Sequence, residues 1–329
     1  MANSSVGRRE FISLLGGAVA AWPRAARAQA APVIGFLNST SPDPTLQRVA
    51  AFRQGLNQLG YGGQSVAIEF RWAENQHYRL QNLAADLVRR RVAVIAATGG
   101  TSAALAAKHA TSTIPIVFEI GGDPMAAGLV DDNNGARGNL TGISLNVIAL
   151  AQSQFELLRK FKPNASLVAM FVNPDNPNSG AQQARVEAAA RAIGMQTLIL
   201  HVNKETGFDQ PFMTLVQRRA DALFVGFDSF FLEWRREIVA LAALHSVPTI
   251  YPVRAYAADG GLMSYGASII EGYHQVGVYV GRILKGEKPT DLPIVNAIKF
   301  KLAINVTTAR TIGLDLPSSL LASADEVIQ

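Results

Sequence analysis

The sequence predicts an α/β protein of two structurally similar lobes, each built on a parallel sheet covered by helices on both faces. Short apolar segments alternate with helical segments along most of the chain, which is typical of strands buried on both faces of a sheet. The pattern also repeats, which favours two lobes over one large sheet. Three strand ends recur at offsets of 135, 130 and 133 residues: Asn38 and Asn173, Thr98 and Asp228, and Phe118 and Tyr251.

Hydrophobic periodicity and turn residues predict the elements in order. In the first half, strands are expected at 33–37, 66–72, 92–97 and 114–118, with helices at 46–59, 80–90 and 101–110. In the second half, strands are expected at 167–172, 222–227 and 248–251, followed by helices at 269–284 and near 307–313.

Two glycine-containing segments, Thr141–Ser144 and Gly260–Gly266, are interpreted as crossovers between the lobes. They divide the chain into discontinuous domains. The first lobe is expected to comprise residues 32–143 plus about 267–297, and the second residues 144–266 plus about 298–329.

The N-terminus has the three parts of a secretory signal. Arg8 and Arg9 precede an apolar run over 11–22, and Ala26-Arg27-Ala28 offers a cleavage site. The run is far shorter than the roughly 20 residues that span a bilayer, so no stable membrane insertion is expected after cleavage. We therefore predict a cleaved twin-arginine signal peptide over residues 1–28 and a periplasmic protein, the alternative being an ordinary cytoplasmic helix.

Charge and cysteine content exclude several classes of protein. The predicted leader holds four of the 30 basic and one of the 25 acidic residues, so the mature chain keeps 26 and 24, a net charge of +2. This near balance does not favour a nucleic-acid partner. The chain has no cysteine, which excludes disulfides, thiolate catalysis and cysteine metal sites.

Sequence signatures of catalysis are missing. There is no G-x-S-x-G elbow, phosphate-binding loop, H-E-x-x-H motif or carboxylate cluster at metal spacing. The five histidines are scattered along the chain. We therefore expect no enzyme, no catalytic residues, no cofactor and no metal; a hydrolase or isomerase on a doubly wound fold is the rejected alternative.

Polar residues at the predicted strand ends point to a ligand site, because ligands of open parallel sheets bind outside the carboxyl ends of the strands. Thr98–Ser102 is glycine-rich and leads into a helix N-terminus, which favours an anion such as a carboxylate; a plain helix cap is the alternative. Turns also select such residues, so each loop taken alone has a simpler explanation. Together they predict a cleft lined by Asn38, Ser39, Thr98, Thr101, Ser102, Gly121, Asp123, Asn173, Asn176, Asp228, Tyr251, Arg254 and Tyr265. Asp228 could hold the amino end of a zwitterion, and Phe227, Phe230, Tyr251 and Tyr265 could form aromatic walls.

Several motifs resemble an ABC-transporter substrate-binding family that includes tryptophan- and tyrosine-binding members. The similarity covers essentially the whole chain and is carried by Arg8–Ile12, Pro32–Asn38, Ala51–Leu56, Pro115–Phe118, Phe171–Pro174, Gly260–Gly266, Val280–Gly286, Pro289–Leu292 and Ala324–Ile328. The resemblance implies the type I periplasmic binding protein fold, with two Rossmann-like lobes, a multi-crossover hinge and closure on a ligand.

The resemblance also implies a function and partners. The expected role is to capture a small organic molecule, an amino acid or an aromatic or carboxylate compound, for an inner-membrane ABC permease and its ATPase; a monomer is expected. Fold relatives that bind amino acids place ligand-gripping groups near Thr101, Ser102, Gly121 and Asp123. Many also have an acidic residue after the strand ending at Tyr251, where this chain has Arg254, which suits a carboxylate ligand instead. A ligand-sensing module that docks on a receptor kinase is the alternative function.

Overall fold

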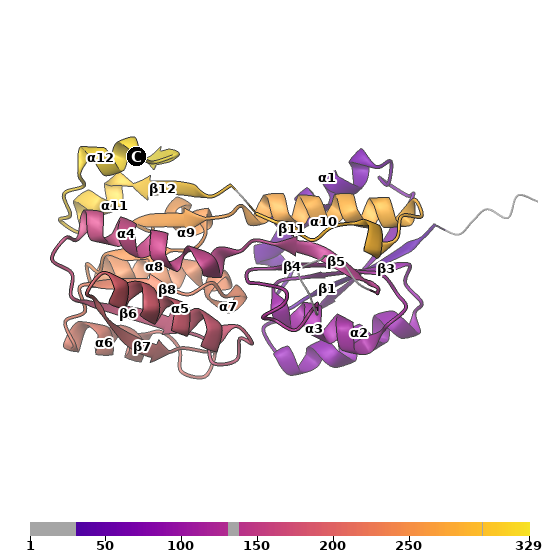
Figure 1. Cartoon of the computed structure of the whole chain (residues 1–329), viewed down its shortest axis with the longest axis horizontal. Coiled ribbons are helices and arrows are strands. Elements are labelled where there is room, and N and C mark those ends of the chain that lie inside the picture. Colours follow the sequence, from indigo (N-terminus) through magenta and orange to yellow (C-terminus); the bar gives the residue numbers. More distant parts are fainter. Residues whose placement is uncertain (1–30, 131–137, 298) are drawn as a thin grey trace, which may run out of the picture. The chain divides into compact units, whose positions relative to one another are not determined.

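Two β-sheets organise the part of the chain that the structure describes (Figure 1). The structure is a computed structural model, and it describes residues 31–130, 138–297 and 299–329. The predicted signal peptide at 1–28 lies outside these residues. None of the described helices combines the length and the apolar character that crossing a membrane requires.

The first sheet contains six strands, all parallel, in the order β11-β5-β4-β3-β1-β2. Helices α1 and α10 lie on one face of this sheet and α2 and α3 on the other (Figure 1). The strands are β1 Val33–Asn38, β2 Ala67–Trp72, β3 Val94–Thr98, β4 Ile116–Ile120, β5 Leu140–Ser144 and β11 Val295–Asn296. The helices are α1 Leu46–Gln58, α2 Leu80–Arg89, α3 Thr101–Ala110 and α10 Ile269–Leu284, with short 3-10 turns at Asp43–Thr45, His77–Arg79 and Pro289–Asp291.

The second sheet contains seven strands in the order β13-β12-β10-β9-β8-β6-β7. Its strands are β6 Leu167–Val172, β7 Gln196–His201, β8 Ala222–Val225, β9 Thr249–Tyr251, β10 Met263–Gly266, β12 Lys301–Asn305 and β13 Glu326–Ile328. Its helices are α4 Ala151–Phe161, α5 Ser179–Ala192, α6 Asp209–Gln217, α7 Ser229–Glu233, α8 Arg235–Leu244, α9 Arg254–Ala258, α11 Val306–Thr311 and α12 Ser318–Ala322, with a 3-10 turn at Val147–Leu150.

The two sheets share one strand order, which confirms the predicted α/β fold class of two lobes. The order β2-β1-β3-β4-β5 of the first sheet corresponds to β7-β6-β8-β9-β10 of the second. The central strands β3 and β4 are buried along their whole length. These strands therefore need a helical layer on both faces, and the alternating chain supplies it.

Several features of the sheets differ from the sequence prediction. Strand β7 was not predicted, and Met263–Gly266, within the second expected crossover, forms strand β10. Thr141–Ser144, expected to be a crossover, lies within strand β5, where its backbone pairs with β4. Strand β12 runs antiparallel to β10. The chain leaves the second sheet at the carboxyl end of β10 and forms α10 and β11 with the first sheet. It then returns to the same edge of the second sheet, so β12 begins beside the end of β10 and runs in the opposite direction. The lobe boundaries that we predicted remain a prediction.

Helices α1 and α10 are in backbone contact although more than 200 residues separate them. A Cβ atom added at Gly55 would lie 2.1 Å from the carbonyl oxygen of His274, and one added at Gly277 would lie 2.1 Å from that of Phe52. Only glycine permits this approach, because any side chain would collide with the opposite backbone. The contact holds α10 against α1 in the first lobe.

We predict that Gly277→Ala lowers the free energy of unfolding by about 2 kcal/mol, because the helices must separate to admit the methyl group and overpacking outweighs the gain in helix propensity. Gly180→Ala in α5 is the matched control, since nothing lies within 4 Å of its added Cβ. That control should be neutral or stabilising. Urea unfolding followed by circular dichroism measures both, and equal stability of the two variants would contradict the close-packing interpretation.

Candidate functional site

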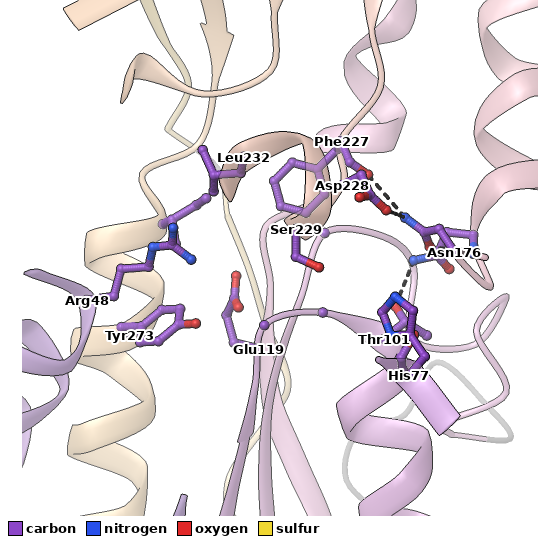
Figure 2. Close-up of a pocket in the computed structure, with 16 residues that line it drawn as sticks. Arg48, His77, Thr101, Glu119, Asn176, Phe227, Asp228, Ser229, Leu232 and Tyr273 are labelled. Carbon is purple, nitrogen blue, oxygen red and sulfur yellow. Dashed lines mark hydrogen bonds between the residues drawn. The ribbon is translucent and has the colours of Figure 1, made fainter. Parts of the chain in front are cut away.

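A small cavity lies where the carboxyl ends of β3 and β4 of the first sheet approach the loops after β6 and β8 of the second (Figure 2). Its volume is about 30 Å³, which is room for a water molecule but far below the roughly 150 Å³ of a cavity that binds benzene. A solute of amino-acid size would therefore need the walls to separate. The lining residues are Arg48, His77, Gly99, Gly100, Thr101, Ser102, Glu119, Gly121, Asn176, Asn178, Phe227, Asp228, Ser229, Leu232, Ile269 and Tyr273.

The glycine-rich turn after β3 presents a helix N-terminus to the cavity. Gly99 and Gly100 have φ angles of +82° and +108°, which L side chains rarely adopt. The turn leads directly into α3, whose first residues Thr101 and Ser102 line the cavity. First-turn N–H groups have no partner within their own helix, so this end of α3 suits a carboxylate. The Thr101 hydroxyl accepts a 2.7 Å hydrogen bond from the Asn178 amide, which comes from the second sheet's loops.

A buried polar network stands behind the cavity wall and orients Tyr273. The Asn38 amide donates to the Thr98 hydroxyl (2.9 Å) and to the Tyr273 hydroxyl (3.0 Å). Its side-chain oxygen accepts from the backbone and side chain of Thr40, both at 2.8 Å. Asn38 therefore has all its hydrogen-bonding groups occupied, and it supports the site without lining it. Ser39 likewise donates to the Gly99 carbonyl.

Glu119 is the carboxyl group that points most directly into the cavity. It lies on β4, is 3% exposed, and projects between Tyr273 and Ser229 (Figure 2). Burial raises its pKa to about 7, although the positive charge of Arg48 and the Gly99 N–H oppose this shift. The carboxyl group thus changes charge near neutral pH and can meet a cationic group of a ligand.

Asp228 is the second buried carboxyl group, and the protein itself occupies most of its acceptor positions. One oxygen accepts from Phe230 N (2.7 Å), Phe231 N (3.2 Å) and the Asn173 amide (3.2 Å), and the other from the Asn176 amide (2.7 Å). Asp228 thereby caps α7. Burial raises its pKa despite these hydrogen bonds and the nearby His77. It is thus a structural cap as well as a cavity residue.

Apolar groups form the remaining walls. Phe227, Leu232, Ile269 and Tyr273 line the cavity. A Cβ atom at Gly121 would lie 2.1 Å from the Phe227 ring, so glycine at this position makes room for that ring. The cavity therefore combines an aromatic surface with opposite charges.

The structure brings five of the predicted residues onto the cavity wall and places four directly behind it or beside it. Thr101, Ser102, Gly121, Asn176 and Asp228 line the cavity, whereas Asn38, Ser39, Thr98 and Asn173 support the lining residues.

Four predicted residues do not line this cavity, because the strand-end pattern identifies the edge of a sheet and not the direction of each side chain. Asp123 accepts from the Met125 N–H in its own turn, and buried Tyr251 stacks on Tyr256. Arg254 is ion-paired with Glu326, and the Tyr265 ring packs against Phe300. Of the four aromatic residues suggested as walls, only Phe227 lines the cavity; Phe230 stacks on Phe208.

Sequence reasoning missed several cavity residues. Glu119 is an acid inside an otherwise apolar strand, and Arg48 is a buried arginine in the first turn of α1; both positions break the local pattern and could have been noticed. Tyr273 left no such signal, since an aromatic residue in an apolar helix reads as core. Asn178, Ser229 and His77 were also missed.

Comparisons with known proteins assign the chain to a family. The family model "ABC transporter substrate binding protein" matches residues 33–328, and the chain belongs to this family. Its members bind solutes and are not enzymes; they work with an ABC permease. A curated relative, a tyrosine-binding protein of Clostridioides difficile, is 24% identical over 82% of this chain and 78% of its own length.

Solved structures are similar over most of the chain. An ABC domain from Streptococcus pneumonia in complex with L-Trp has a TM-score of 0.83 and 26% identity, covering 90% of this chain and 99% of that one. A ligand-free, open substrate-binding protein from Clostridium difficile has a TM-score of 0.65 and 24% identity, covering 91% and 99%. The similarity to the open protein shows a shared fold and nothing more.

We predict that Glu119→Gln removes a pH dependence of stability. An acid whose pKa is raised on folding stabilises the folded state below its unfolded pKa of about 4.5, and that contribution is lost as pH rises through about 7. The wild type should therefore lose about 2.5 kcal/mol of unfolding free energy relative to Glu119→Gln between pH 5 and pH 8. Urea unfolding at each pH tests this, with the exposed Glu205→Gln as control; parallel curves for wild type and Glu119→Gln would count against it.

Asp228→Ala should lower the free energy of unfolding by about 2 kcal/mol or more, because it uncaps α7 and leaves the buried Asn173 amide and the half-buried Asn176 amide without their acceptor. Asp228→Asn keeps the oxygen that accepts three of the four hydrogen bonds, so it should cost less. Thermal unfolding of the two variants measures the difference. Equal stability would show that the cap contributes little.

Proposed function

We propose that the protein captures a small organic solute in this cavity, in the periplasm, and delivers it to an inner-membrane ABC permease with its ATPase. The observation that carries the proposal is the composition of the wall, to which loops of both sheets contribute. A solute held there would touch both lobes and favour their closure, as hinge-type binding proteins require. The predicted signal peptide supports export, and we propose that the protein acts as a monomer.

The wall groups suit an aromatic amino acid or a related aromatic carboxylate. The N-terminus of α3 and the Arg48 guanidinium can meet a carboxylate, Glu119 can meet an ammonium group, and Phe227 and Tyr273 can pack on a ring. His77 Nδ1 is buried on the wall without a hydrogen-bond partner among the described residues, so it is available to a ligand. The tyrosine-binding relative and the L-Trp complex support the aromatic class.

Hinge motion is part of the proposal because the cavity is so small. Its volume of about 30 Å³ admits no amino acid until the walls move apart. The structure is more similar to the L-Trp complex than to the open, ligand-free relative, with TM-scores of 0.83 and 0.65. These values support a closed arrangement of the walls.

Isothermal calorimetry against a panel of solutes tests the function. The panel comprises L-tyrosine, L-tryptophan, tyramine, 4-hydroxyphenylpropionate, benzoate and a nucleoside. We expect the aromatic amino acids to bind best, because tyramine lacks the carboxylate and the phenylpropionate lacks the amine. No binding by any compound in the panel would count heavily against the proposed function.

Phe227→Ala should weaken binding of the preferred compound about tenfold or more, since burying an aromatic side chain contributes on the order of 1.5–3 kcal/mol. Leu244→Ala is the control, because Leu244 is 74% exposed and does not line the cavity. An unchanged affinity in Phe227→Ala would place the solute elsewhere.

A further inference from the structure

A second and larger cavity adjoins the first. Its volume is about 440 Å³, and it shares Arg48, Leu232 and Ile269 with the first cavity. In Figure 2, Arg48 and Leu232 lie on the side opposite His77 and Asn176, so the shared wall is at one end of the first cavity. The second cavity extends the first along this side and has the room that the first lacks.

Cationic side chains dominate the wall of the second cavity. Among the described residues, the cations Arg48, Arg235, Arg236, Arg254 and Lys301 line it, together with one carboxylate, Asp259. Arg235 lies 2.7 Å and Arg236 3.6 Å from the same Asp259 oxygen, and Arg254 is paired with Glu326. One shared acid cannot balance two arginines, so the described part of this wall keeps a positive charge at Arg235 and Arg236.

Four helix N-termini open onto this cavity, and three of them carry arginine where a helix disfavours it. Gln47 and Arg48 lie in the first turn of α1, Arg235 and Arg236 begin α8, Arg254 begins the short α9, and Ile269 and Ile270 begin α10. A cation in a first turn opposes the helix dipole and destabilises the helix. The acids that do lie in first turns, Glu237 of α8 and Glu271 of α10, do not line the cavity.

A wall of this composition favours a ligand that carries an oxyanion. Unpartnered N–H groups, dipole ends and guanidinium groups all attract an oxyanion, and arginine binds carboxylate and phosphate in a two-pronged geometry. A local arrangement that costs stability is retained mainly where function compensates it. The wall is also shared between the lobes, since α1 and α10 pack in the first lobe and α8 and α9 belong to the second.

We propose that the second cavity is an oxyanion subsite that binds a carboxylate or phosphate group of the solute held in the first cavity. The inference rests on the proposed function and narrows its substrate class to an extended solute with a separate anionic group. Such a group would contact arginines of both lobes and so favour closure.

The test compares L-tyrosine with O-phospho-L-tyrosine by calorimetry at low ionic strength. The wild type should bind the phosphorylated compound about tenfold or more tightly, and Arg236→Gln combined with Arg254→Gln should remove this preference while leaving L-tyrosine affinity unchanged. Arg236 is 81% exposed and Arg254 57% exposed in their side chains, so the variant should fold. The matched control combines Arg185→Gln with Arg218→Gln, which removes the same charge at two exposed positions outside both cavities.

A second arm titrates inorganic phosphate and citrate into the same three proteins. Binding of these anions by the wild type and the control, but not by the cavity variant, supports the subsite. If the anions bind in this way but the wild type binds O-phospho-L-tyrosine no more tightly than L-tyrosine, the cavity is a site for free anions. That result would overturn the proposal that the cavity binds a group of the solute. Equal results for the cavity variant and the control would overturn the subsite altogether. If no compound of the solute panel binds, the proposed function is wrong, whereas the anion titration tests the subsite independently.

Discussion

The backbone contact between α1 and α10 supports both cavities, because these two helices carry residues of each wall. Arg48 belongs to α1, and Ile269 and Tyr273 belong to α10. Helix α10 follows a strand of the second sheet but packs in the first lobe, where Gly55 and Gly277 let it approach α1. If the helices stood further apart, Tyr273 would move away from Asn38 and the polar network behind the first cavity would lose its anchor.

Buried charge is the second constraint on the site. Glu119 and Asp228 are both removed from water, and burial raises the pKa of each. The protein treats them differently. Asp228 accepts four hydrogen bonds from neighbouring groups, so its surroundings hold it in place, whereas Glu119 is balanced chiefly by Arg48 and one N–H. Both carboxyl groups line the cavity, but Glu119 accepts fewer hydrogen bonds and points more directly into it, so a cationic ligand group would complete its surroundings.

The fold was largely predictable because its signals are local and repeated. The observed α3 and α10 have the predicted bounds, since each follows a clear turn and continues as one helical pattern. Strand β5 was not predicted, because Leu140–Ser144 is short and contains glycine and hydroxyl residues that resemble a connection. The antiparallel direction of β12 depends on where the chain returns to the second sheet, which no local pattern records.

The sequence by itself determined the alternation of strands and helices, the repeat of the two halves and the glycine-rich turn before Thr101, because each depends on neighbouring residues. Only the tertiary structure decided which strand-end residues meet. Arg254 and Asp228 each follow a strand of the same sheet, yet one lines the larger cavity and the other the smaller. Side-chain direction and packing between distant helices decide such placements. For the same reason, Arg48, Glu119 and Tyr273, which lie far apart in the sequence, were united at one site only by the fold.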